Sequence, residues 1–206
     1  MTRLEEANIL VAGVGGQGNI LASAIISKAA IDAGYKVIAS ETFGASQRGG
    51  AVASHIRISN RSLSPIIPEG KGDILLGFEP LESLRIGSKF LSSKGWAIIN
   101  TRPIYPVDVM ISNSRYPSVD EILTLIRRIS GKTVAIEATK LAEKAGDPLA
   151  MNIVMVGALA GTENLLIEMN AFKETITEIV PKRTVEVNIK AFEAGYKDVK
   201  EKIRNN

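Results

Sequence analysis

A glycine-rich turn between an apolar run and a helix-forming run is the sequence feature that most constrains the fold. Residues 9–12 are apolar, residues 13–18 read Gly-Val-Gly-Gly-Gln-Gly, and residues 19–26 favour a helix. This order predicts a strand over about 8–12, a tight turn, and a helix over about 17–33 that ends before Gly34. Such a turn directs several backbone N–H groups and the positive end of a helix toward one point, which suits an anion.

The turn fits the dinucleotide-binding pattern G-x-G-x-x-G, and an acid follows where the ribose would be bound, about 20 residues further along. Glu41 is that acid, at the end of a strand predicted over about 36–40. A nicotinamide or flavin nucleotide site is therefore one interpretation. The other is a tight strand-to-helix connection or a site for a different ligand, because the pattern alone is common. The residues that form the turn are Gly13, Gly15, Gly16, Gln17 and Gly18.

The composition restricts the chemistry that the chain can perform. It has no cysteine, which excludes disulfides, thiolate-bound zinc and iron–sulfur clusters held by this chain. Its single histidine, His55, excludes a multi-histidine metal site, so we expect no metal and no catalytic residue here. His55 lies in an alternating pattern over residues 51–58, which predicts a partly exposed strand residue.

Size and charge indicate a folded protein rather than a disordered one. The chain has 206 residues, of which 45% are hydrophobic and 23% are charged, enough to bury a core. Its net charge is +3, and its 25 Lys and Arg residues are scattered among 22 acids, which favours a solvated surface over a nucleic-acid site. Residues 2–6 do not resemble a signal peptide, and the longest apolar stretch, 151–161, is too short to span a bilayer. We therefore expect a cytoplasmic protein without a nucleic-acid or membrane partner.

Strand and helix patterns alternate along the chain. Strands are predicted over about 8–12, 36–40, 51–59, 73–78, 96–100, 107–111 and 133–137, and helices over about 17–33, 80–91, 118–130, 139–145, 149–160, 171–179 and 184–202. This alternation predicts a three-layer α/β fold with a mostly parallel, doubly wound (Rossmann-like) sheet. Residues 1–168 would form the α/β domain, and residues 169–206 a C-terminal helical extension of the same domain. Ligands of such sheets bind beyond the carboxyl ends of the strands. The glycine turn and the glycines at 49–50 both follow predicted strand ends, so we expect them to face the same edge.

Four segments in a fixed order carry a family resemblance. After the turn at 13–18, residues 40–50 read Ser-Glu-Thr-Phe-Gly-Ala-Ser-Gln-Arg-Gly-Gly, residues 64–67 read Ser-Pro-Ile-Ile, and residues 73–82 read Asp-Ile-Leu-Leu-Gly-Phe-Glu-Pro-Leu-Glu. Together they resemble the gamma-type subunits of the 2-oxoacid:ferredoxin oxidoreductases over nearly the whole chain. The Gln-Arg-Gly-Gly form after Ser-Glu is similar to the indolepyruvate branch, in which this subunit is called beta. The pair Thr42-Phe43 departs from the Val-His of that branch, so the substrate stays open between aryl-2-oxoacids and pyruvate, 2-oxoglutarate or branched-chain 2-oxoacids.

The resemblance implies a complex rather than an enzyme that acts alone. A larger partner subunit would bind thiamine diphosphate and carry the iron–sulfur clusters. The reaction would be oxidative decarboxylation of a 2-oxoacid, with coenzyme A as acyl acceptor and ferredoxin as electron acceptor. This chain would bind no cofactor alone and would be inactive alone, in agreement with its lack of cysteine.

The second glycine site is the predicted ligand or subunit-interface loop. Arg48 carries a planar fork of donors that suits phosphate or carboxylate, and the adjacent glycines allow close approach of the backbone. We expect this loop to reach coenzyme A or the partner's cofactor region; an ion pair of Arg48 within a tight turn is the alternative. The loop residues are Glu41, Gln47, Arg48, Gly49 and Gly50.

Two further acids follow the strand predicted over about 73–78. Glu79 and Glu82 lie at the start of a helix, where capping and surface charge are expected. A nicotinamide-dependent enzyme and a non-catalytic α/β binding module remain alternatives to the oxidoreductase subunit. A nicotinamide enzyme needs a proton-transfer residue, and the only Tyr-x-x-x-Lys pair, Tyr196 with Lys200, lies far along the chain from the turn.

Overall fold

A six-stranded sheet forms the centre of the molecule. The computed structural model describes residues 6–43, 50–60, 64–105, 116–165 and 167–205. The strands are β1 (Ala7–Val14), β2 (Val37–Phe43), β3 (Ala51–Ile58), β4 (Gly72–Gly77), β5 (Leu91–Asn100) and β6 (Lys132–Ile136). Their order is β2-β3-β1-β4-β5-β6, in which β3 is antiparallel to both neighbours and the other pairs are parallel. The mostly parallel sheet is confirmed, while the strand predicted over 107–111 lies outside the described residues.

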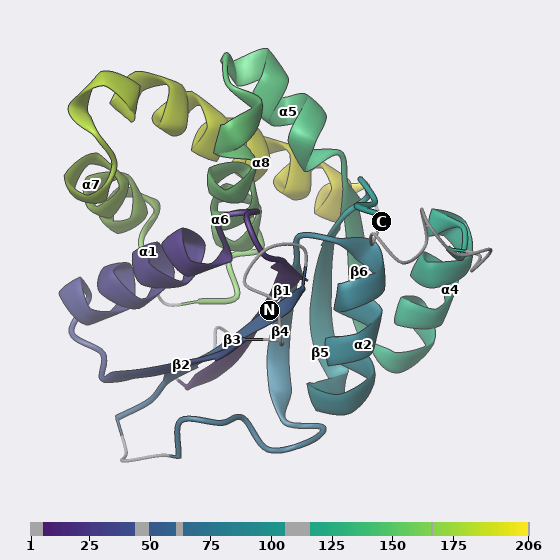
Figure 1. Cartoon of the computed structure of the whole chain (residues 1–206). Helices are drawn as coiled ribbons and strands as arrows, with labels where there is room; N and C mark the ends of the chain where they lie inside the picture. The colour runs from purple at the N-terminus through teal and green to yellow at the C-terminus, as the bar shows by residue number, and fades with distance from the viewer. Residues whose placement is uncertain (1–5, 44–49, 61–63, 106–115, 166, 206) are drawn as a thin grey trace.

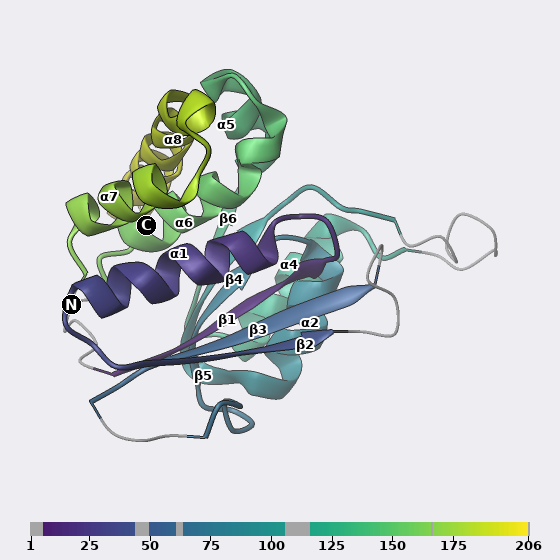
Figure 2. The same ribbon diagram turned by 60° about the vertical axis from the view of Figure 1, so that its left-hand side comes forward.

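Helices cover both faces of this sheet, which confirms the three-layer prediction (Figures 1 and 2). Helices α2 (Pro80–Phe90) and α4 (Val119–Ile129) lie on one face. The other face carries α1 (Asn19–Asp32), α5 (Ala138–Ala145), α6 (Met151–Gly161), α7 (Met169–Ile179) and α8 (Val185–Arg204). Short 3₁₀ helices span Pro148–Ala150 and Lys182–Thr184. Each face therefore has its own apolar core, with the sheet between them.

Local signals in the sequence explain where several helices begin and end. Ser118 and Glu121 form the predicted capping box of α4, since the Ser118 N–H donates to Glu121 Oε2 at 2.8 Å and the Glu121 N–H donates to Ser118 Oγ at 3.2 Å. Pro80 occupies the first turn of α2, where its missing N–H costs nothing. Gly34 follows α1 with a φ of 90°, which a glycine adopts without strain.

His55 is buried, so the prediction of a partly exposed strand histidine is wrong. The residue is 1% exposed, and its ring meets that of Phe90 edge-on at 4.9 Å between centroids. Its Nδ1 accepts a hydrogen bond from the Ile67 N–H at 3.3 Å. The alternating pattern implied one solvent-facing side, but β3 lies between β2 and β1 and both of its faces are covered.

Burial lowers the pKa of His55 below its ordinary value. The unfolded chain then takes up this proton at a higher pH than the folded chain, so the stability contributed here should be complete above about pH 6.5 and lost as the pH falls. Thermal melts between about pH 7.5 and 5.5 should show a smaller pH-dependent loss in His55→Gln, which cannot titrate there. The raised pKa values of Asp73 and Glu82 have the opposite effect, because they increase stability as the pH falls, and wild type and His55→Gln share this contribution. Identical pH dependence in the two proteins would contradict this expectation.

The C-terminal helix α8 packs very closely on α6. A Cβ at Gly157 of α6 would lie 2.0 Å from the carbonyl oxygen of Phe192, and a Cβ at Gly195 of α8 would lie 1.9 Å from that of Val154. Both distances are far below any van der Waals contact, so the two backbones approach each other only because these positions lack side chains. Helix α8 thus contacts α6 backbone to backbone at these two positions.

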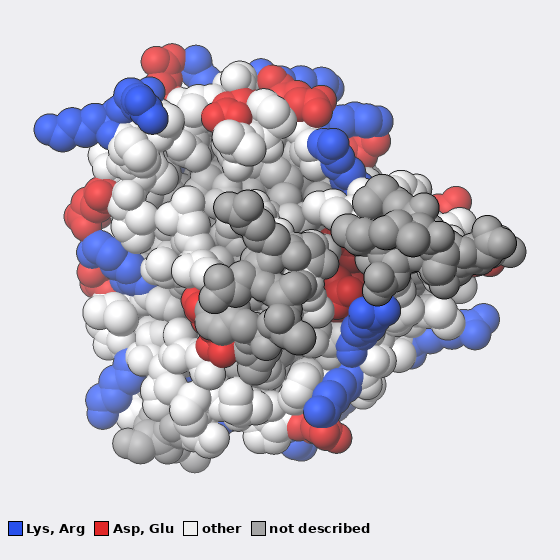
Figure 3. All heavy atoms as spheres, in the orientation of Figure 1, with Lys and Arg blue, Asp and Glu red and all other residues white. Residues whose placement is uncertain are grey.

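Charged side chains of both signs are interspersed on the surface. Around the face shown in Figure 3, Lys and Arg lie beside Asp and Glu. Charged side chains also form ion pairs within helices, such as Lys28 with Asp32 at 2.8 Å and Lys190 with Glu186 at 2.6 Å. Within the described ranges, no helix combines the length and the apolar character needed to cross a bilayer.

Candidate functional site

The two glycine sites meet at the carboxyl edge of the parallel strands. The Gly15 N–H donates to the carbonyl oxygen of Gly50 at 2.9 Å, and Val14 pairs with Ala51 at the adjoining ends of β1 and β3. Figure 2 shows the turn between β1 and α1 on the same side of the molecule as the adjoining ends of β2 and β3. The predicted shared edge is therefore correct for Gly50, whereas Gln47, Arg48 and Gly49 lie outside the described residues.

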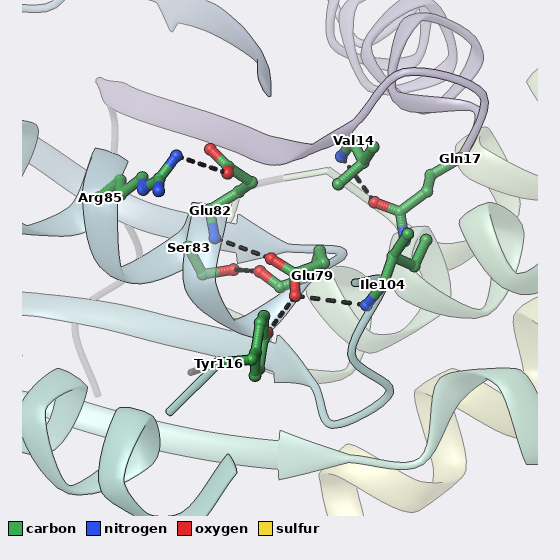
Figure 4. A network of polar contacts seen from close by, with 8 residues as sticks. All are labelled: Val14, Gln17, Glu79, Glu82, Ser83, Arg85, Ile104 and Tyr116. Atoms are coloured by element: carbon green, nitrogen blue, oxygen red, sulfur yellow. Dashed lines mark hydrogen bonds and ion pairs between the residues drawn. The ribbon is translucent and has the colours of Figure 1, made fainter. Parts of the chain in front are cut away.

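The backbone N–H donors of the glycine turn form hydrogen bonds within the protein. Gln17 Oε1 accepts from the Val14 N–H at 2.7 Å (Figure 4). Gln17 Nε2 donates to the Phe78 carbonyl at 3.0 Å. The Gln17 N–H in turn donates to the Val14 carbonyl at 3.2 Å. Gln17 thus bridges β1 and β4 where the following helices, α1 and α2, leave on opposite faces of the sheet, which is where such folds bind nucleotides. With the Gly15 N–H bound to Gly50, three of the turn's N–H groups are unavailable to a phosphate.

Close packing explains two of the turn's glycines. A Cβ at Gly13 would lie 2.6 Å from Gln17 Oε1, and a Cβ at Gly18 would lie 2.4 Å from Asn152 Nδ2 on α6. Gly18 also has a φ of 80° and precedes α1 without a side-chain cap. Gly16 has a φ of 99° and open space around it, so backbone conformation alone favours glycine there. Packing and turn geometry therefore account for Gly13, Gly16 and Gly18 without a nucleotide.

Glu41 lies one strand further from the turn than a ribose-binding acid would. In the dinucleotide-binding fold, the strand that carries the acid lies beside the first strand. Here β3 separates them: Glu41 pairs with Ser54, and Ser54 pairs with Val11 of β1. Two strand spacings of about 4.8 Å each therefore separate Glu41 from β1 where one would be needed.

A buried carboxylate lies directly after β4, at Glu79. Its Oε2 accepts from the Glu82 N–H at 2.8 Å, and its Oε1 accepts from the Ile104 N–H at 3.4 Å and from the Tyr116 hydroxyl (Figure 4). The predicted capping role is confirmed, because Glu79 is the N-cap of α2. The predicted surface position is wrong for Glu79 and Glu82, which are only 1% and 6% exposed.

Two neighbours of Glu79 have raised pKa values. Burial raises the pKa of Glu82, and the charge of Glu79 raises it further, while Arg85, at 3.1 Å from Glu82 Oε1, opposes both. Burial also raises the pKa of Tyr116, as does its hydrogen bond to Glu79. The Tyr116 phenol therefore stays protonated and donates to the carboxylate.

Asn100 and Tyr116 belong to this edge although the sequence analysis did not single them out. Asn100 is buried; its Nδ2 donates to the Phe78 carbonyl at 3.1 Å and its Oδ1 accepts from the Ala138 N–H at 3.1 Å. It thereby joins the ends of β4 and β5 to the start of α5. A polar residue directly after the apolar run at 96–99 was the available signal. For Tyr116 the sequence offers no comparable sign.

Tyr196 and Lys200 of the Tyr-x-x-x-Lys pair are in contact, but the pair has a structural role. Lys200 Nζ lies 3.0 Å from the Tyr196 hydroxyl, and both contact Glu163, which follows α6. The hydrogen bond to Glu163 raises the pKa of Lys200, as does the one to Tyr196, so the ammonium group retains its proton. This cluster fastens α8 to the end of α6 and does not provide a proton-transfer site beside the turn.

Comparisons with known proteins agree on one family. A family model described as pyruvate ferredoxin/flavodoxin oxidoreductase matches residues 8–198. The chain is 41% identical over 189 residues to the indolepyruvate oxidoreductase subunit IorB of Archaeoglobus fulgidus, covering 92% of this chain and 93% of that one. It is also 41% identical over 199 residues to the IorB subunit of Pyrococcus horikoshii, covering 96% and 98%. The crystal structure of a keto/oxoacid ferredoxin oxidoreductase gamma subunit from Geobacter sulfurreducens matches with a TM-score of 0.68 at 26% identity, covering 94% and 98%.

Proposed function

Because the chain belongs to the pyruvate ferredoxin/flavodoxin oxidoreductase family, we propose that it is the beta (gamma-type) subunit of an indolepyruvate:ferredoxin oxidoreductase. The complex would convert an aryl-2-oxoacid and coenzyme A to an acyl-CoA and carbon dioxide, with transfer of two electrons to ferredoxin. The observation that carries the proposal is the near-full-length match to two IorB subunits at 41% identity. Subunits for pyruvate, 2-oxoglutarate or branched-chain 2-oxoacids are the alternatives within the family.

The division of labour follows from this chain's own residues. Without cysteine it cannot ligate an iron–sulfur cluster, and the donors of its glycine turn at Val14, Gly15 and Gln17 are already used. Thiamine diphosphate and the clusters, held by a large partner subunit, would supply the carbanion and electron-transfer chemistry. The role of this chain is then to bind and orient, which agrees with the hydrogen bonds that brace the carboxyl edge around the glycine turn.

The loop that contains Arg48 is the proposed contact with that partner or with coenzyme A. The hydrogen bond from Gly15 to Gly50 anchors the end of this loop beside the glycine turn. Glu41 lies on β2, before the loop, and Gly50 ends it. The proposed contact residues remain Glu41, Gln47, Arg48, Gly49 and Gly50.

The geometry disfavours a nicotinamide nucleotide at the same turn. Gln17 joins the ends of β1 and β4, where a pyrophosphate would lie, and Glu41 is displaced by the interposed strand β3. A nicotinamide-dependent enzyme would therefore need a site other than the one that the glycine pattern suggests.

Reconstitution tests the proposal. The chain alone should show no 2-oxoacid-dependent dye reduction, whereas co-expression with the large subunit should give a stable complex that reduces ferredoxin in the presence of indolepyruvate and coenzyme A. In that complex, Arg48→Ala should lower assembly or catalytic efficiency by roughly ten- to a hundredfold, because a charge-assisted contact contributes about 1.5–3 kcal/mol.

Two controls separate the possible roles of Arg48. Arg127→Ala removes an exposed arginine from α4 and should leave the complex unchanged. A lower melting temperature of isolated Arg48→Ala with normal turnover would assign Arg48 to its own loop. Turnover by the chain alone, or reduction of NAD in place of ferredoxin, would overturn the proposed function.

A further inference from the structure

Glu79 holds residues from two segments that lie outside its own helix. Of its three donors, only the Glu82 N–H belongs to α2, while the Ile104 N–H and the Tyr116 hydroxyl come from residues after β5 and before α4. Residues 106–115, between these two partners, lie outside the described residues. The carboxylate therefore connects the start of α2 with both of these segments.

Capping α2 does not require a buried charge. Ser118 caps α4 with a hydroxyl at an accessible position. Burying a carboxylate costs several kcal/mol unless partners compensate for its lost hydration. Among the ion pairs found within the described part of the chain, none includes Glu79, and its donors are all neutral. The buried carboxylate of Glu79 therefore carries a desolvation cost, and its contacts outside α2 are with Ile104 and Tyr116.

Tyr116 connects Glu79 to an exposed residue, Tyr105. Its ring lies 5.0 Å from that of Tyr105 between centroids, at 77°, an edge-to-face arrangement. Tyr105 is 53% exposed, and the neighbouring Ile104 is 37% exposed. Two large apolar side chains thus stand at the carboxyl edge, one of them packed against a tyrosine whose hydroxyl is fixed by Glu79. Exposed tyrosines on a rigid support are enriched among residues that dominate protein interfaces.

We infer that Glu79 and Tyr116 are positioning residues that hold Tyr105 ready to contact the large subunit of the complex. The inference rests on the proposed function, because it takes the partner subunit as the occupant of this edge. The chain of contacts runs from Glu79 through the Tyr116 hydroxyl and ring to Tyr105. It adjoins the glycine turn, since Phe78, the residue before Glu79, accepts the hydrogen bond from Gln17.

A double-mutant cycle in the affinity between the purified chain and the large subunit tests this inference. Tyr105→Ala should weaken binding at least about tenfold without changing the melting temperature of the isolated chain, because its side chain is largely exposed. Tyr116→Phe keeps the ring and the cap of α2 but loses the hydroxyl, and should also weaken binding by several-fold. Because Tyr116 acts through Tyr105, the double variant should bind no more weakly than Tyr105→Ala alone.

Two further variants distinguish positioning from simple stabilisation. Tyr196→Phe removes a comparable tyrosine–glutamate hydrogen bond on α8 and should leave the affinity unchanged. Glu79→Gln keeps an acceptor oxygen for Tyr116 and should retain most of the affinity. Full additivity of the two tyrosine variants, or wild-type affinity in both, would overturn the inference alone. Failure of the wild-type chain to bind the large subunit would overturn the proposed function and this inference with it.

Discussion

Gly195→Ala is expected to lower the melting temperature of the chain by about 6–12 °C. The new Cβ would lie 1.9 Å from the carbonyl oxygen of Val154, and a backbone atom cannot move aside as a side chain can. Helices α6 and α8 would have to separate, and overpacking of this kind costs about 3 kcal/mol or more. For a chain of this length, each kcal/mol corresponds to about 2–4 °C.

Gly87→Ala is the matched control, because it also places a methyl group on a helical glycine. At Gly87 the nearest atom to the new Cβ is a terminal methyl of Leu75 at 3.0 Å, which can shift. Its melting temperature should therefore stay within about 2 °C of the wild type, since alanine also favours the helix. Equal melting temperatures for Gly195→Ala and wild type would mean that α8 does not pack on α6 as described.

The same experiment bears on the proposed domain organisation. We propose that residues 169–206 are an extension of the domain formed by residues 1–168, and that both unfold together. Calorimetry of Gly195→Ala should then show one transition shifted as a whole. A separate low-temperature transition for the C-terminal helices, with the remainder unchanged, would identify an independent unit.

Gln17→Ala should cost about 2–3 kcal/mol, or roughly 4–12 °C in melting temperature. The change removes the hydrogen bond from Gln17 Nε2 to the Phe78 carbonyl and leaves the buried Val14 N–H without its acceptor. Thermal or denaturant unfolding of the isolated chain measures the loss directly.

Asn19→Ala is the control for this prediction, since Asn19 lies two residues further along and is also an amide. Asn19 is 3% exposed, and neither polar atom of its side chain has a hydrogen-bond partner in the described structure. Asn19→Ala should therefore cost less than Gln17→Ala. Gln17→Glu should be as harmful as Gln17→Ala, because it turns a carboxylate toward the Phe78 carbonyl. A larger loss in Asn19→Ala would show that Gln17 does not bridge β1 and β4.

Most secondary-structure elements could be predicted because their signals are local. The apolar run and the glycines at 13–18 specify β1, the turn and the start of α1, and the capping box at Ser118 specifies the start of α4. Pro80 marks the start of α2 in the same way. Such signals act through neighbouring residues along the chain, so they can be identified before any tertiary contact is known.

The chemistry of the site could be predicted only in part. Gly15 and Gly50 were expected at one edge, because both follow strand ends in a mostly parallel sheet, and their hydrogen bond confirms it. The environment of Glu79 was missed because its partners, Ile104 and Tyr116, are 25 and 37 residues away. The same holds for His55, whose buried face is covered by Ile67 and Phe90.

The amino-acid sequence alone determined that this protein is an α/β chain with a glycine turn after its first strand, and that it has no cysteine and a single histidine. Periodicity, caps and turn residues are sufficient for this, because they depend on local backbone geometry. Only the tertiary structure decided that β3 separates Glu41 from the turn, that Gln17 joins the ends of β1 and β4, and that Glu79 is buried. These features depend on strand order and long-range packing, which place residues side by side regardless of their separation along the chain.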